Sequence, residues 1–462
     1  MSVHVTTDSL IRAVDATLMT YLADGSVPGI SLAITGRETL ILARTGGFAE
    51  VTTRRPVNSD TLFEIGSIGK SFTAHVILQL AAEGRLAVDD LVVRHLPWFR
   101  VPRTGERITI HHLLSHTAGI TAGIDATPEA TMQVHRLRDL PPGSSPGRRF
   151  HYSNVGYKAL GLIIEAIEGT SYASAVRRRV MDRAGMAASE PAITNAMRGR
   201  LAVGYGPAVD DMPWHRGDPL APATWLETDT ADGSVAATAL DMAAYLRWLM
   251  ADLEAGGPVA RMATPVPALG AYGYGYGLLR FTRDGREYVG HGGGMVGFTS
   301  GMTWDPAAGI GAVVLQNGPG GAPTFLSRQL VRQAVAAAEG RDPAMEPVES
   351  PPDDEEEDED GARRPTAPTP EQAVIVGTYR SHDPWEPVFR VEARNGELWL
   401  TIPSEPDGFE AEQVLLPMAG GWWRVGADRL GPERMRFDMV IDGRARRAWL
   451  SGWPSYRVDP WT

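Results

Sequence analysis

The pattern of apolar and polar positions divides most of the chain into helical and strand-like segments. Strict alternation and β-branched runs predict two buried strands at residues 29–36 and 38–45, and residues 272–315 are strand-like with many glycines. Strands therefore come first and last around a mainly helical middle, which favours an α/β (α+β) sandwich whose sheet is built from both chain ends. Apolar residues recur at helical spacing in residues 1–23, 67–84, 155–169, 237–253 and 323–340.

The texture of the chain changes after residue 340. Residues 341–370 are rich in proline and acidic residues, with acidic residues alone at 353–360, which predicts a solvated linker. The short alternating runs that follow contain the turn sequences Asn395-Gly396 and Asp442-Gly443, which favour hairpins. We therefore predict a first domain at 1–340, a linker at 341–370 and a small antiparallel β-barrel or half-barrel at 371–462. Seven of the 12 tryptophans lie in this last segment, where we expect them to pack in the barrel core.

Charge and composition exclude several classes of function. The net charge is −12, and the eight acidic residues of 353–360 leave only −12 + 8 = −4 for the rest, with no basic stripe for nucleic acid. The absence of cysteine excludes disulfides and cysteine nucleophiles. Charged residues interrupt residues 1–23 at helical spacing, and no segment has the roughly 18 apolar residues of a membrane span. We expect a cytoplasmic protein with no membrane partner, cofactor or bound metal.

Lysine is nearly absent from this chain. Only Lys70 and Lys158 are lysines among its 44 basic residues, and the others are arginines. Arginine does not give up its proton in a protein, whereas lysine can. This selective use points to Lys70 as a base. Lys158, one turn into the helix predicted at 155–169, is expected at the surface.

Three short motifs carry candidate chemistry. Residues 63–70 read FEIGSIGK, so Ser67 and Lys70 lie one helical turn apart and their side chains can meet. The second motif is Tyr152-Ser153-Asn154, 85 residues beyond Ser67, and the third is His291-Gly292-Gly293-Gly294, a further 139 residues on. Taken singly, each has a plain structural interpretation: a helix N-cap with a surface lysine, a core tyrosine beside a capping Asn154, and a strand-end histidine.

Together and in this order, the motifs resemble those of the serine β-lactamase and penicillin-binding-protein family, closest to its class C, D-peptidase and esterase branch. Flanking stretches are similar as well: ITIHHLLSHTAGI at 108–120, YGYGYGL at 272–278 and GFTSGMTWDP at 297–306. The resemblance covers residues 8–340. It implies a β-lactamase/transpeptidase-like sandwich of an antiparallel sheet and helices, followed here by a lipocalin-like β domain.

The resemblance also implies roles for the motif residues. Ser67 would attack a carbonyl carbon and form an acyl-enzyme, and Lys70 would take its proton or pass it to Tyr152. The phenol of Tyr152 would serve as base or relay and then protonate the leaving group. Asn154 would hold Lys70 and an amide of the substrate.

The third motif would bind the substrate. His291 stands where the lactamases have lysine, and we expect it to supply a weaker, pH-dependent positive charge. The glycines that follow would line the substrate site, with the N–H groups of Ser67 and Gly294 forming an oxyanion hole.

Two competing motifs fail on their context. Residues 143–147 formally match the nucleophile elbow G-x-S-x-G, but prolines surround them and predict a loop. His111, His112 and His116 lack the spacing of a zinc site, and packed histidines on a helix are the better interpretation.

The sequence thus predicts a serine hydrolase acting on esters or on amides of small or D-configured peptides. Its partner would be a small-molecule or peptide acyl substrate, and its oligomeric state stays open. One alternative is a penicillin-binding-protein-type thioesterase that cyclises nonribosomal peptides, which would transfer the acyl group to an internal amine. A second is a pseudoenzyme that only binds acylated or peptidoglycan-like ligands, with the β domain as a docking module.

Overall fold

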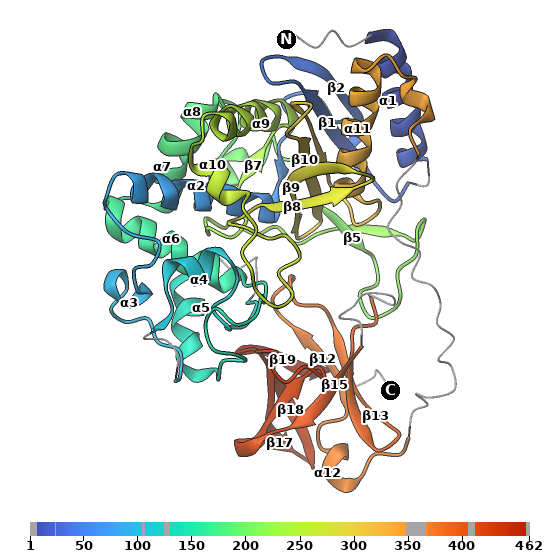
Figure 1. The fold of residues 1–462 in the computed structure, drawn as a ribbon. Coiled ribbons are helices and arrows are strands. Elements are labelled where there is room, and N and C mark those ends of the chain that lie inside the picture. The colour runs from blue at the N-terminus through green and yellow to red at the C-terminus, as the bar shows by residue number, and fades with distance from the viewer. Residues whose placement is uncertain are drawn as a thin grey trace.

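A seven-stranded antiparallel sheet lies at the centre of the N-terminal part (Figure 1). The structure is a computed structural model of the 462-residue chain, and it describes residues 7–23, 25–103, 107–123, 130–347, 366–404 and 412–458. The strand order is β3-β2-β1-β11-β10-β9-β8, so the first and last strands of this part pair with each other. The strands are β1 (Gly29–Thr35), β2 (Leu40–Glu50), β3 (Arg55–Pro56), β8 (Leu279–Arg283), β9 (Arg286–Met295), β10 (Phe298–Asp305) and β11 (Ile310–Gln316).

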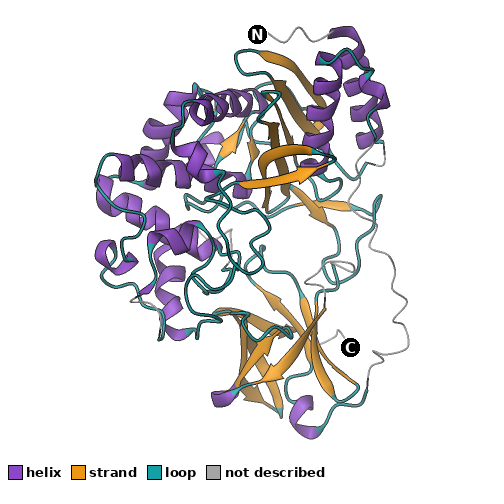
Figure 2. Cartoon of the chain, in the orientation of Figure 1, coloured by secondary structure: helices purple, strands orange, loops and turns teal. Residues whose placement is uncertain are grey.

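Helices cover both faces of this sheet (Figure 2). Helices α1 (Thr7–Leu22) and α11 (Pro323–Ala338) pack together on one face, while α9 (Ala239–Glu254) packs against β1 and β11 on the other. All seven residues of β1 and of β11 are buried, as expected for strands covered on both sides. The predicted sandwich with one sheet from both chain ends is confirmed.

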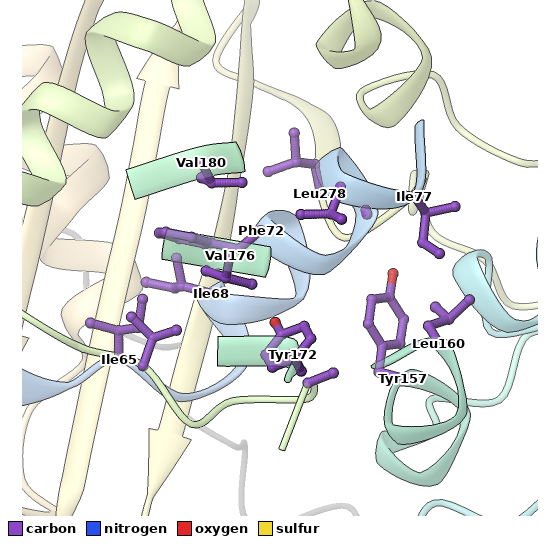
Figure 3. Packing of buried hydrophobic residues seen from close by; sticks show 14 of the residues in the cluster. Ile65, Ile68, Phe72, Ile77, Tyr157, Leu160, Tyr172, Val176, Val180 and Leu278 are labelled. Carbon is purple, nitrogen blue, oxygen red and sulfur yellow. The ribbon is translucent and has the colours of Figure 1, made fainter. Parts of the chain in front are cut away.

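The middle of the chain forms a helical region around α2 (Gly69–Ala82), which a 3₁₀ turn at Gly66–Ile68 precedes. The first 12 residues of α2 are all buried. Figure 3 shows Phe72 of α2 packed beside Val176, with Tyr157 and Leu160 nearby. The surrounding helices are α3 (Val92–His95), α4 (Ile110–Leu114), α5 (Ala130–Arg136), α6 (Asn154–Glu168), α7 (Tyr172–Val176), α8 (Asp182–Ala184) and α10 (Pro258–Met262). Short strand pairs join β4 (Phe63–Glu64) to β7 (Ala236–Ala237) and β5 (Tyr205–Pro207) to β6 (Leu220–Pro222).

The C-terminal part is a closed barrel of eight antiparallel strands, because β12 pairs with β19. Asn395-Gly396 and Asp442-Gly443 form the two predicted hairpin turns, with positive φ at all four residues. A short helix, α12 (Pro370–Ala373), precedes the barrel, and the acidic run 353–360 lies outside the described residues. The strands are β12 (Gly377–Ser381), β13 (Phe389–Arg394), β14 (Glu397–Thr401), β15 (Glu412–Pro417), β16 (Trp422–Val425), β17 (Arg434–Ile441), β18 (Arg444–Leu450) and β19 (Trp453–Val458).

The barrel core differs from the prediction. Its buried residues include Tyr379, Phe389, Leu398 and Met435, whereas the six described tryptophans of the barrel are only half-buried and Trp461 lies outside the described residues. The expectation that the tryptophans fill the core is therefore wrong. Eight short strands enclose little volume, so the large indole rings lie at the rim and along the surface, where several stack on arginines.

Candidate active site

Ser67 and Lys70 meet at the start of the buried helix α2. Ser67 lies in the 3₁₀ turn and Lys70 in the first turn of α2, which places both side chains on one face. Lys70 Nζ lies 2.9 Å from Ser67 Oγ, and its exposed fraction is 0%, against 8% for Ser67. The hydroxyl is thus reachable from outside, while the amine behind it is shielded from water.

A second buried lysine stands behind this pair. Lys70 Nζ also donates to the backbone oxygen of Asp232 at 2.7 Å, and the carboxylate of Asp232 lies 3.5 Å from Lys158 Nζ. Lys158 and Asp232 are both fully buried, so the expectation that Lys158 lies at the surface is wrong. The amphipathic face of α6 alone does not show this, because the carboxylate that accompanies Lys158 comes from a loop 74 residues away.

The start of α6 delivers the second motif. Ser153 is the N-cap of this helix and accepts a hydrogen bond from the N–H of Gly156 at 3.1 Å, so the cap is Ser153 and not Asn154. Lys70 Nζ lies 4.9 Å from the centre of the Tyr152 ring. Asn154 is buried, and its side-chain oxygen accepts no hydrogen bond within the described part of the chain. Tyr152 and Lys70 are therefore neighbours, and the amide of Asn154 is available to a ligand.

The third motif lies on β9, alongside the residues that precede the nucleophile. A Cβ atom on Gly66 would stand 2.6 Å from the backbone nitrogen of Gly294, and one on Gly293 would collide with the backbone oxygen of Ile65. Gly66 also has a φ of +53°. Only glycines permit this approach, which brings the N–H of Gly294 close to the turn that carries Ser67.

A chain of hydrogen bonds links His116, Tyr274 and His291. The N–H of Ser153 donates to His116 Nδ1 at 2.9 Å, which leaves the proton of the neutral ring on Nε2. His116 Nε2 lies 3.1 Å from the Tyr274 hydroxyl, which lies 3.1 Å from His291 Nε2. In this arrangement His116 donates to Tyr274, Tyr274 donates to His291, and His291 Nδ1 donates to the backbone oxygen of Gly292.

The charge expected on His291 is corrected by this geometry. Burial lowers the pKa of His291 to about 4, and the nearby Lys70 lowers it too, against an opposing hydrogen bond to Gly292. Burial likewise holds the pKa of His116 well below its usual value. His291 is therefore a neutral imidazole near pH 7, and not the pH-dependent cation that its place in the motif suggested. Sequence reasoning missed His116 and Tyr274 as site residues, although both lie in stretches that resemble the family.

The other histidines of the proposed packed group do not form a metal site. His111 contacts the Tyr276 hydroxyl, and His112 caps α4 through a reciprocal pair of hydrogen bonds with Thr109. Within the described ranges, no group of three or more His, Cys, Asp or Glu side chains could hold a metal ion. In that same part of the chain, no helix is both long and apolar enough to cross a membrane.

A buried carboxyl group and a small cavity lie next to the nucleophile. Glu64, three residues before Ser67, lines a cavity of about 190 Å³ together with Arg198, Trp225 and Phe298. Burial raises the pKa of Glu64 to about 8, so this side chain is a neutral acid at pH 7. It can donate a hydrogen bond into the cavity.

The barrel also reaches this region. A Cβ atom on Gly294 would lie 3.9 Å from Trp385, which belongs to the loop between β12 and β13. Trp385 is half-buried, and its backbone N–H is held by the Asp383 carboxylate at 2.9 Å. The barrel therefore places an aromatic ring over the glycines of the third motif.

Comparison with known proteins agrees with this site. Residues 14–337 match the family model described as Beta-lactamase, and the chain belongs to the β-lactamase family. Protein flp from Staphylococcus aureus (strain NCTC 8325 / PS 47) is 28% identical over 338 residues, which cover 68% of this chain and 64% of flp. The chain thus spans less than two thirds of this relative. Esterase EstB from Burkholderia gladioli is 30% identical over 233 residues, which cover 46% of this chain and 56% of the esterase.

Two solved structures extend the comparison. The octameric penicillin-binding protein homologue from Pyrococcus abyssi has a TM-score of 0.63 and 24% identity, with 97% of this chain and 100% of that chain covered. This is a likeness of fold, and it includes the barrel. A D-stereospecific amidohydrolase from Streptomyces sp. has a TM-score of 0.58 and 26% identity, with 70% of this chain and 97% of that chain covered.

Proposed function

We propose that this protein is a serine hydrolase that forms an acyl-enzyme on Ser67 and acts on esters or on amides of small or D-configured peptides. The observation that carries the proposal is the 2.9 Å contact between Ser67 Oγ and a fully buried Lys70 amine. The names of two similar proteins, an esterase and a D-stereospecific amidohydrolase, support the substrate class.

In the proposed acylation, Ser67 Oγ attacks the acyl carbon while its proton moves to Lys70 Nζ, directly or through the phenol of Tyr152. The carbonyl oxygen becomes an oxyanion that accepts hydrogen bonds from the N–H groups of Ser67 and Gly294. When the C–O or C–N bond breaks, the leaving group takes a proton from Tyr152. A water molecule then attacks the acyl-enzyme, which releases the acid and restores the hydroxyl of Ser67.

The charge state of the site supports an uncharged substrate. A neutral His291 provides no ionic contact for a carboxylate, and its Nε2 already accepts a hydrogen bond from Tyr274. The free side-chain oxygen of Asn154 is suited to an N–H group in the acyl part of the substrate. Trp385 offers an apolar face to that part.

The test is intact-mass spectrometry after brief exposure to p-nitrophenyl acetate and to a fluorophosphonate. We expect one adduct on the wild-type protein and none on Ser67→Ala, and product analysis then separates free acid from acyl transfer. Lys70→Arg keeps the positive charge but cannot accept the proton, so it should lose acylation by about 10³-fold or more. No adduct on the wild type, or the same adduct on Ser67→Ala, would refute the mechanism.

A further inference from the structure

One carboxylate of the barrel is inserted between the two segments that carry the second motif. Glu433, directly before β17, accepts hydrogen bonds from Thr121 Oγ1 at 2.7 Å and from the N–H of Ala122 at 2.9 Å. The same carboxylate lies 2.9 Å from His151 Nε2. Because a carboxylate accepts and His151 must donate, all of these contacts point from the catalytic domain into the barrel.

These contacts surround Tyr152 in the chain and in space. His151 is the residue before Tyr152, and its N–H donates to the backbone oxygen of His116 at 2.7 Å. On the other side, the backbone oxygen of Ala122 accepts the N–H of Asn154 at 2.7 Å. Ser153 Oγ donates to the backbone oxygen of Thr121 at 2.7 Å. Glu433 therefore holds both segments that define the position of Tyr152 and Asn154.

The neighbouring barrel residues reinforce this contact. Arg149 forms an ion pair with Asp428, and a Cβ atom on Gly143 would collide with the backbone of Leu430. The side chain of Glu433 is 25% exposed. Burial alone would raise its pKa, but the hydrogen bonds it accepts outweigh burial and lower the pKa to about 2. The group is thus a permanent anion in a tight interface.

We infer that Glu433 is a positioning residue for catalysis: it acts from the barrel, through His151 and the Thr121–Ala122 segment, to hold the Tyr152 phenol where it can protonate the leaving group. This inference rests on the proposed function. It also gives the barrel a defined part in the reaction, because the catalytic domain supplies no other acceptor for His151 Nε2 among the described residues.

The test compares three variants on p-nitrophenyl, phenyl and benzyl esters of one acid. Leaving groups that are poorer need more help from a proton donor, so displacement of Tyr152 should cost more along this series. For Glu433→Ala we expect a kcat loss of about 10-fold on the p-nitrophenyl ester and about 100-fold on the benzyl ester, with KM nearly unchanged. Glu433→Gln keeps one acceptor oxygen and should recover part of the loss, and it serves as the second variant if Glu433→Ala folds poorly.

The matched control is Asp438→Asn on β17. Asp438 is a barrel carboxylate that accepts hydrogen bonds from Arg447 and Trp449 of the adjacent strand β18. It should leave the ester series parallel to the wild type. Fluorophosphonate labelling of Ser67 should stay within about 3-fold in the Glu433 variants, because fluoride leaves without a proton.

The outcomes separate this inference from the function beneath it. If Tyr152→Phe loses activity increasingly along the series and the Glu433 variants lose it equally on all three esters, Glu433 has no positioning role and the proposed function stands. If Tyr152→Phe shows no such trend, the proposed role of Tyr152 fails, and the role of Glu433 fails with it. A trend in both, absent in Asp438→Asn, supports the inference.

Discussion

Lys158 Nζ lies 3.5 Å from Asp232 Oδ2 in the interior of the catalytic domain, and neither side chain is exposed to solvent. The backbone oxygen of the same Asp232 holds Lys70. One residue therefore serves both lysines of the chain, the first through its main chain and the second through its side chain.

Removal of Lys158 should destabilise the protein strongly. Lys158→Met leaves the buried carboxylate without its cation, which costs about 3–5 kcal/mol of unfolding free energy. Urea unfolding at pH 7 measures this loss. The double variant Lys158→Met/Asp232→Asn should recover most of it, because no buried charge remains; a single variant as stable as the wild type would contradict the structural role of the pair.

His291 should stay neutral through the range in which free histidine titrates. The Cε1 resonance of His291, assigned by comparison with His291→Asn, is expected to stay constant between about pH 8 and 5.5. The folded state binds its proton only near pH 4, whereas the unfolded state binds it near 6.5, so this group stabilises the fold above 6.5 and that contribution is lost as pH falls from 6.5 to 4. A resonance that titrates with a midpoint near pH 6.5 would contradict the buried chain of hydrogen bonds from His116 to His291.

Glu64 should affect stability in the opposite direction. Its pKa is raised from 4.5 to about 8 in the folded protein, so the folded state holds the proton longer and stability falls as pH rises from 4.5 to 8. Glu64→Gln removes this penalty, which grows by about 1.4 kcal/mol for each pH unit within that range. Thermal melts should show the variant gaining on the wild type between about pH 5 and 9, whereas the exposed Glu397→Gln should show no gain. Parallel curves for wild type and Glu64→Gln would exclude a raised pKa at Glu64.

Trp385 should select the acyl group. Trp385→Ala removes the aromatic face beside Gly294, so KM for esters of long or aromatic acids should rise about 10-fold while acetate esters change little. Steady-state kinetics on a series of p-nitrophenyl esters measures this. Trp422→Ala is the control, since this half-buried indole stacks on Arg436 within the barrel. An equal effect of both variants would place Trp385 outside the substrate site.

Much of the fold was predictable because its signals are local. Helical periodicity located α2, α6, α9 and α11 within a few residues, and the Asn-Gly and Asp-Gly turns located two barrel hairpins. The one-turn spacing of Ser67 and Lys70 likewise follows from helix geometry alone, and the structure places them 2.9 Å apart. The tryptophans of the barrel were misplaced, because hydrophobicity does not reveal how little room a small barrel encloses.

The sequence by itself determined the elements, the order of the three motifs and the resemblance to a family. Only the tertiary structure decided the burial of Lys158, the neutral state of His291 and the insertion of Glu433 beside Tyr152. Each of these depends on groups far away in the chain: Glu433 and Thr121 are 312 residues apart. A side chain's charge and its partners follow from the desolvation and hydrogen bonds that distant segments impose, and no local pattern encodes them.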